Sequence, residues 1–171
     1  MIRATAPAEA LRLPDGRFRL HLARANLGFA AANNFGAADC EAPWLATLNP
    51  DTVAGKTWLE ELRSATLRHP GVKMFGSTQP EARRPDRVDG FGDVYSVFGT
   101  AWRGASGSPV SALPPDDREI FAPCAAAALY ARDAYRTRRE RFRVALRAAG
   151  LAFDCASITA VSTHSQKSYR S

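Results

Sequence analysis

The fold prediction depends on one stretch, residues 123–150, which reads PCAAAALYARDAYRTRRERFRVALRAAG. A run of alanines favours a helix, because alanine has the highest helix propensity. Gly150 marks the end, since glycine is common just beyond the last helical residue. The stretch therefore predicts a long helix over residues 123–149.

This helix would have an apolar face and a basic face. Tyr135, Phe142 and Leu146 recur at helical spacing, which predicts that they are buried. Seven arginines occur between positions 132 and 147. Five of them would lie within roughly a quarter of the helix circumference. These five are Arg132, Arg136, Arg139, Arg143 and Arg147.

The arginine row has three interpretations. It can follow a line of phosphates, bind an acidic protein surface, or form a solvated face whose ion pairs are worth about 0.3–0.5 kcal/mol each. Two acidic residues, Asp133 and Glu140, cannot neutralise seven arginines. The leading hypothesis is therefore binding of nucleic acid or another phosphate-rich ligand. A second basic group, Arg83, Arg84 and Arg87, would widen that surface.

Strands and a shorter helix are expected before and after the long helix. The sequence predicts a β-hairpin at 10–22, a buried strand at 44–48, a capped helix at 57–68, strands at 72–75, 94–102 and 157–162, and an exposed loop at 76–92. Together these elements predict one domain, residues 1–171, of α/β or α+β class. Its mixed sheet would have about 4–6 short strands, with the 123–149 helix packed across it.

Composition restricts the class of protein. The formal charge of +6 and the pI near 9.7 favour polyanionic partners by long-range attraction. No apolar run reaches the roughly 18 residues of a membrane-spanning helix, and the first residues lack a secretory signal. A cytoplasmic protein without a membrane partner is expected. The three cysteines form no C-x-x-C pair and the three histidines are far apart, so neither a metal site nor a cofactor is expected.

An enzyme is the alternative, and the sequence does not decide between the two. His164 follows the last predicted strand, and in open α/β sheets the carboxyl ends of strands face the ligand crevice. His164 could act as a general base toward the Ser165 hydroxyl or the Cys40 thiol, with Asp39 as an acidic partner. Such a site would belong to a small hydrolase or transferase that needs no cofactor.

Two glycine-containing loops are weaker candidates. Gly55-Lys56-Thr57 matches the end of a phosphate-binding Walker loop, but Pro50 replaces the first glycine and Asp51 adds negative charge. This segment is therefore interpreted as the start of a capped helix. The loop at 99–108 could cradle an anion with backbone N–H groups, or it could be a surface turn.

Overall fold

The structure is a computed structural model that describes residues 15–135 and 160–163, the last four by their backbone. The chain divides into two compact units. Unit 1 is Met1–Asp39 and unit 2 is Cys40–Ser171.

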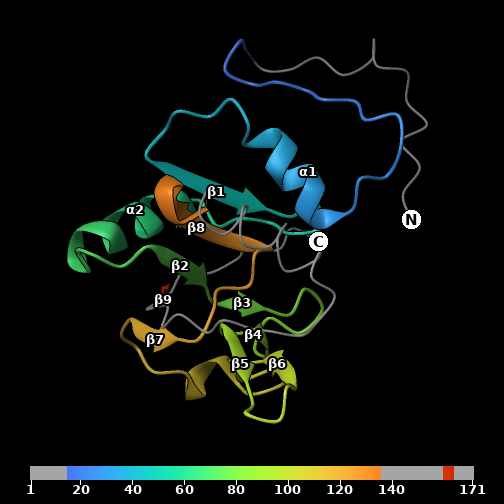
Figure 1. The fold of residues 1–171 in the computed structure, drawn as a ribbon. Helices are drawn as coiled ribbons and strands as arrows, with labels where there is room; N and C mark the ends of the chain where they lie inside the picture. The colour runs from blue at the N-terminus through green and yellow to red at the C-terminus, as the bar shows by residue number, and fades with distance from the viewer. Residues whose placement is uncertain (1–14, 136–159, 164–171) are drawn as a thin grey trace. The chain divides into compact units, whose positions relative to one another are not determined.

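Unit 2 is built on a five-stranded sheet, which we call the main sheet, with strand order β1-β8-β2-β9-β7 (Figure 1). Strands β2 and β9 are parallel, and all other neighbours are antiparallel. Strand β2 therefore has neighbours on both sides. The strands are β1 (Trp44–Leu48), β2 (Met74–Ser77), β7 (Arg118–Ile120), β8 (Ala127–Ala131) and β9 (Ala160–Thr163).

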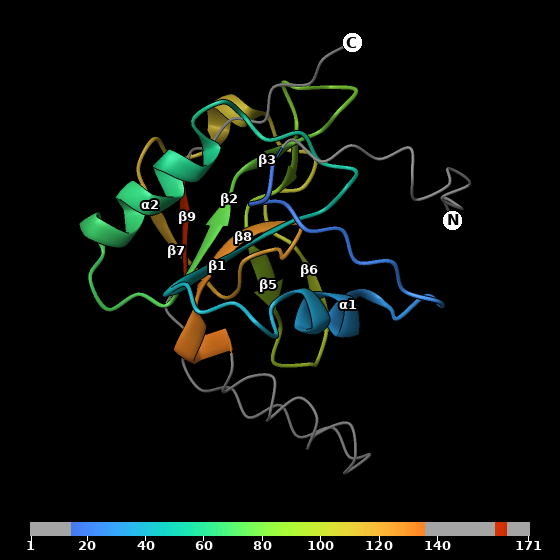
Figure 2. The same cartoon turned by 90° about the horizontal axis from the view of Figure 1, so that it is seen from above.

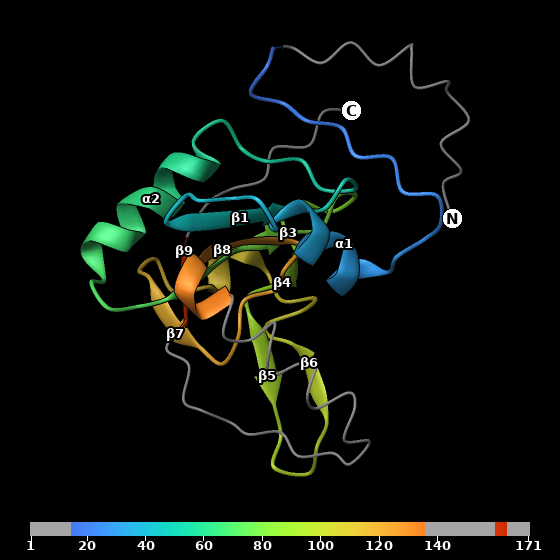
Figure 3. The same cartoon turned by 45° about the horizontal axis from the view of Figure 1, so that its top comes forward.

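Helix α2 (Trp58–Arg68) packs on the main sheet and contacts β2 and β9 (Figures 2 and 3). Its buried residues recur at i, i+4 and i+7, the spacing of one helix face. On the sheet side, the same face of β2 and β8 supplies the other half of the core. The cluster consists of Trp58, Leu62, Ala65, Phe75, Ala127 and Leu129.

The predicted helix over residues 123–149 is wrong, and so is the α/β or α+β class built on it. Residues 127–131 form β8, the residues described as helical after it are 132–135, and residues 136–149 lie outside the described residues. Ala127, Ala128 and Leu129 are all buried, so both faces of β8 are covered. Helix propensities differ by less than about 1 kcal/mol per residue, and pairing with two strands in the core outweighs them.

The described chain is mostly strands in three small sheets, with only short helices. Among the residues of the predicted helix that we expected to be buried, Tyr135 is half-buried, and its ring contacts that of Tyr130 edge to face. Phe142 and Leu146 lie outside the described residues.

Residues 79–112 form what we call the small-sheet region. It contains two two-stranded sheets and one 3-10 helix. The exposed loop predicted at 76–92 is too long, since Gly76 to Pro80 are buried and two strands occur within it, and only residues 82–86 form a continuous exposed segment without a strand. The predicted strand at 94–102 is a hairpin of two strands. The elements are β3 (Gln79–Pro80), β4 (Val88–Gly90), β5 (Asp93–Tyr95), β6 (Ala101–Arg103) and η2 (Val110–Ala112).

Unit 1 contains one short helix, α1 (Phe29–Gly36). Of the hairpin predicted at 10–22, residues 10–14 lie outside the described residues. Residues 15–17 form a turn, and residues 18–22 have no strand partner within the described part of the chain. The alternating apolar side chains of that segment, Phe18, Leu20 and Leu22, are exposed, so no core selects the strand pairing there.

Candidate functional site

Three strands of the main sheet end at the same edge. Strands β1 and β2 are both antiparallel to β8, so they run in one direction, and β9 is parallel to β2. Leu48 pairs with Ala127, Gly76 with the neighbouring Ala128, and Ser77 with Thr163. We call residues 48–57, 76–79, 123–127 and 162–163 the carboxyl edge.

Buried polar side chains gather at this edge. Within the described residues they are three consecutive ones, Ser77, Thr78 and Gln79, each at most 3% exposed. The indole Nε1 of Trp58 donates a hydrogen bond to Ser77 Oγ at 2.7 Å. A buried hydroxyl needs such a partner, because leaving it unbonded would cost about 1–3 kcal/mol. The carboxyl edge is therefore polar inside and held in place by α2.

The segment after β1 is tied to the same edge. Thr47 Oγ1 donates to the Ala125 carbonyl at 2.7 Å, and the Asn49 N–H donates to the Ala126 carbonyl at 2.9 Å. Thr52 Oγ1 bonds back to the Asn49 carbonyl at 2.7 Å. These bonds order the loop that leads from β1 to α2.

The predicted cap of α2 is wrong. Thr57 occupies the N-cap position, but its side chain makes no capping hydrogen bond. Its backbone angles, φ −99° and ψ 5°, are not the extended conformation from which a side chain reaches the first turn. The Trp58 N–H instead donates to the Gly55 carbonyl at 3.1 Å. That bond engages a backbone N–H that a phosphate-binding loop would direct at its ligand.

The predicted catalytic residues fall in different places. His164 and Ser165 lie outside the described residues, but Thr163, which precedes His164, pairs with Ser77 at the carboxyl edge. Cys40 is half-buried and leads into the amino end of β1. Asp39 is exposed and is the last residue of unit 1. The described chain thus places only the approach to His164 at this edge.

Of the five predicted phosphate-binding arginines of the 132–147 segment, only Arg132 is described. It is half-buried, and its backbone N–H donates to the Pro43 carbonyl at 2.9 Å. Arg132 is the first residue after β8. The other four, Arg136, Arg139, Arg143 and Arg147, lie outside the described residues.

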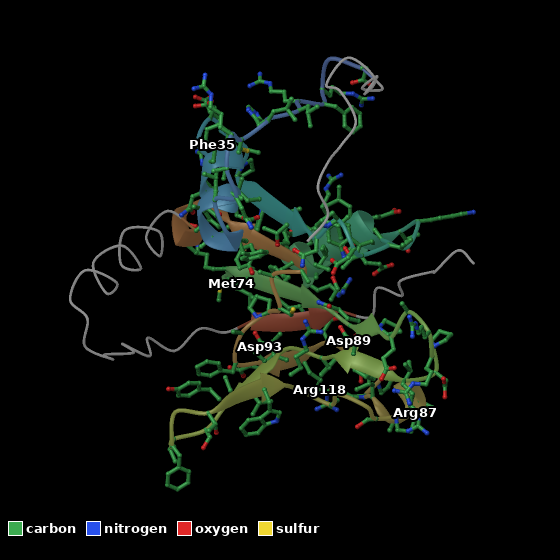
Figure 4. The ribbon with its side chains drawn as sticks, turned by 90° about the vertical axis from the view of Figure 1, so that its right-hand side faces the viewer. Phe35, Met74, Arg87, Asp89, Asp93 and Arg118 are labelled. Carbon is green, nitrogen blue, oxygen red and sulfur yellow. The ribbon has the colours of Figure 1, made fainter. Side chains whose placement is uncertain are left out.

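The second basic group belongs to the small-sheet region, where Figure 4 labels Arg87, and two of its three side chains form hydrogen bonds there. Arg84 forms a double hydrogen bond with Glu81, and an Arg87 guanidinium nitrogen donates to the Gly107 carbonyl at 3.1 Å. Arg83 is exposed and makes no hydrogen bond or ion pair within the described ranges. Of the three, Arg83 is the side chain best placed to meet a ligand.

Sequence reasoning missed a cluster around Asp117. His69 Nε2 and Arg68 Nε lie 2.8 and 2.9 Å from the same Asp117 oxygen, and the Asp117 side chain is only 14% exposed. The partners are almost fifty positions apart, so no local pattern reveals them. The cluster fastens the carboxyl end of α2 to the segment before β7. In the described chain no hydroxyl or thiol group forms a hydrogen bond with the His69 side chain. The cluster therefore acts as a structural clamp.

Charge is unevenly divided along the chain. Residues 15–135 carry 13 basic and 14 acidic side chains, so this part is close to neutral. Residues 132–171 carry 9 basic and 3 acidic side chains, an excess equal to the formal charge of the whole chain. Any long-range attraction of polyanions therefore comes mainly from the last forty residues.

Comparisons of this chain with protein-family models, with curated proteins and with solved structures find no match. Among the residues that the structure describes, no group of three or more His, Cys, Asp or Glu side chains could hold a metal ion. None of the described helices has the length and apolar character needed to cross a membrane.

Proposed function

We propose that this protein is a small transferase or hydrolase that binds a phosphate- or hydroxyl-bearing small molecule at the carboxyl edge. The observation that carries the proposal is the parallel pairing of β2 with β9. This pairing brings Thr163, the residue before His164 in the sequence, opposite Ser77 at the end of β2. In open α/β sheets, ligands bind outside the carboxyl ends of parallel strands, and β2 and β9 form one such parallel pair in this otherwise antiparallel sheet.

The composition of the edge supports the same proposal. At the end of β2 and directly after it, Ser77 and Thr78 carry hydroxyl groups and Gln79 carries an amide, and all three side chains are buried. The bond between Trp58 and Ser77 fixes the first of them. Rigid polar groups behind a surface orient the groups that contact a ligand.

His164 would supply the proton transfer. An imidazole takes a proton from an attacking hydroxyl or water near neutral pH, because its ordinary pKa is about 6.5. The attacking hydroxyl would belong to the ligand, to water or to Ser165. A cytoplasmic location is part of the same proposal.

A thermal-shift screen tests the proposal. The full chain is heated with inorganic phosphate, ATP or glucose 6-phosphate. A ligand at 100 times its Kd stabilises the folded state by about 2.7 kcal/mol, which raises the Tm by several degrees. We expect at least one of these compounds to raise the Tm of the wild-type protein and to do so less for His164→Ala. His21→Ala is the matched control and should respond like the wild type.

The site proposal fails if none of the phosphate compounds raises the Tm. It also fails if His164→Ala responds as strongly as the control, because His164 would then lie away from the ligand.

A second function, binding of nucleic acid through residues 132–147, has a separate observation in its favour. The near-neutral charge of residues 15–135 leaves the net positive charge to the arginine-rich segment. Affinity that depends on phosphate contacts falls steeply with salt and has little base preference.

The salt dependence of binding to a duplex oligonucleotide tests this second function. Replacing Arg136, Arg139 and Arg143 with Ala should weaken binding and reduce the slope of log K against log salt by about 0.9 for each lost phosphate contact. The control removes three other exposed arginines, Arg19, Arg24 and Arg63. Equal loss in both triple variants would show that net charge, not this segment, determines binding.

A further inference from the structure

The hydrogen bonds of the β5–β6 hairpin determine which backbone groups point outward. The Ser96 N–H donates to the Thr100 carbonyl and the Gly104 N–H donates to the Gly92 carbonyl, each at 2.8 Å. In an antiparallel pair, hydrogen-bonded and non-hydrogen-bonded residue pairs alternate. Ala101 and Arg103 are therefore the residues of β6 whose N–H and C=O groups point away from β5.

The outer edges of the two strands differ. On β5, the Asp93 N–H donates to the Ala122 carbonyl at 2.8 Å, and the Tyr95 ring stacks on Phe121 with centroids 5.6 Å apart. On β6, all three residues are exposed. Within the described ranges the outward N–H groups of Ala101 and Arg103 have no partner. An exposed edge of this kind is a template for another strand.

We propose that β6 pairs with β6 of a second copy of this chain, antiparallel and about a twofold axis at Trp102. In that register Ala101 lies opposite Arg103 of the second copy, and each such pair exchanges both backbone hydrogen bonds. Trp102 then lies opposite Trp102 of the second copy in a non-hydrogen-bonded pair, where side chains approach most closely. The same surface serves both copies, as a twofold interface requires.

The side chains fit this register. Val94 lies directly opposite Trp102 within one hairpin, so both are on one face, and they are 37% and 53% exposed. Pairing about the twofold axis would join these residues into one apolar stripe across four strands. The hairpin projects away from the main sheet (Figure 3). No residue from 94 to 102 is charged.

Electrostatics also permits the pairing. Arg103 would lie opposite Ala101 of the second copy, so no like charges face each other directly. Within its own copy, Arg103 forms an ion pair with Asp89 and lies opposite Asp93 in the strand register of the hairpin. A two-stranded sheet is only marginally stable alone, and a four-stranded sheet with an apolar face is more stable.

Sedimentation velocity of the full chain over a range of concentrations tests the association. We expect a dimer that dissociates on dilution. Trp102→Lys places two cations at the twofold axis and should leave monomer at every concentration. Leu67→Lys adds the same charge at a residue of α2 that is 83% exposed, and it should leave the dimer intact. A wild-type protein that is monomeric throughout, or a dimer unaffected by Trp102→Lys, overturns the proposal.

Disulfide trapping tests the register without depending on the stability of the Lys variant. Residues opposite each other in a non-hydrogen-bonded pair have Cα atoms about 4.5 Å apart, within disulfide reach. Trp102→Cys should therefore cross-link to itself under mild oxidation, beyond the background of the native cysteines. Ala101→Cys is also at an exposed position, but in this register it lies opposite Arg103 and should not cross-link. Equal yields from the two variants overturn the twofold pairing at Trp102.

Discussion

The indole N–H of Trp58 and the hydroxyl of Ser77 meet at 2.7 Å, and both side chains are more than 90% buried. Trp58 begins α2 and Ser77 ends β2, so this bond joins the start of the helix to the carboxyl edge of the sheet. It is the direct link between the hydrophobic core and the candidate site.

Removing one partner of the hydrogen bond between Trp58 and Ser77 should lower the stability of the folded state. Trp58→Phe keeps a ring but leaves the Ser77 hydroxyl without its donor, and we expect the free energy of unfolding to fall by about 1–3 kcal/mol. Urea denaturation of Trp58→Phe, Ser77→Ala and the double variant measures the coupling. A coupling of about 0.5–3 kcal/mol is expected for residues in direct contact. Strictly additive losses would show that the bond contributes nothing to stability.

Gly92 cannot be replaced by alanine without strain. Its φ is +71°, and a Cβ there would lie 2.8 Å from three atoms of Ile120, the Cβ included. Gly71 also has a positive φ, +94°, but a Cβ there meets nothing. Gly71→Ala should cost about 1–2 kcal/mol, from the backbone alone. Gly92→Ala should lower the free energy of unfolding by about 1–3 kcal/mol more, because the added Cβ overpacks against Ile120.

Thermal or urea unfolding of the two glycine variants checks this difference. If both variants lose the same stability, Ile120 moves aside freely and the close packing of β7 on this turn is unimportant.

The carboxyl of Asp93 should make stability fall as pH rises. Burial raises the pKa of Asp93 above its ordinary value, and the positive charge of Arg103 opposes that rise. A raised pKa means that the folded state holds the proton more tightly than the unfolded state, so stability declines from the ordinary carboxyl range up through the raised pKa. Asp93→Asn should remove this decline and gain stability relative to the wild type toward neutral pH.

Urea denaturation from about pH 4 to pH 7 measures the effect of Asp93→Asn. Asp116→Asn removes the same charge from an exposed side chain and is the control. A difference between Asp93→Asn and the wild type that stays constant with pH would contradict the prediction.

The Asp117 clamp should contribute to stability rather than to catalysis. Asp117→Ala leaves Arg68 and His69 without their shared acceptor, and we expect a loss of about 1–3 kcal/mol in the free energy of unfolding. Arg68 is 45% exposed, so water replaces part of its interaction and the lower half of that range is expected. Asp116→Ala should change stability by less than about 0.5 kcal/mol. A ligand response reduced by Asp117→Ala alone would instead assign this cluster to the binding site.

Elements with an unambiguous local pattern were predicted correctly. The apolar run at 44–48 is β1, and the helix predicted at 57–68 is α2, although its apolar residues Leu59 and Leu67 are exposed. The strand predicted at 72–75 is shifted to Met74–Ser77, and the strand predicted at 157–162 overlaps β9. In α2 the side-chain period agrees with burial, since Trp58, Leu62 and Ala65 lie on one buried face, whereas the strand predicted to be buried at 44–48 has no buried residue.

The prediction of the long helix was wrong because it depended on helix propensity and not on a pattern of burial. Alanine is small enough to be buried on either face of a central strand, and β8 has β1 and β2 on its two sides. Nothing local distinguishes that environment from a helix. Asp117 and its partners, and the pairing of Thr163 with Ser77, join segments far apart in sequence. Such contacts have no local signal, so the site prediction could reach His164 but not its surroundings.

The place of β9 in the main sheet has a consequence for the order of folding. β9 lies between β2 and β7, although it follows β2 by more than eighty residues in the chain. During synthesis, β2 has an open edge and β7 has no neighbour in the main sheet until residues 160–163 leave the ribosome. Contacts between such distant segments form slowly. The nascent chain therefore carries a central strand with one open edge while residues 78–163 are synthesised, and a chaperone that shields strand edges would protect it during that interval.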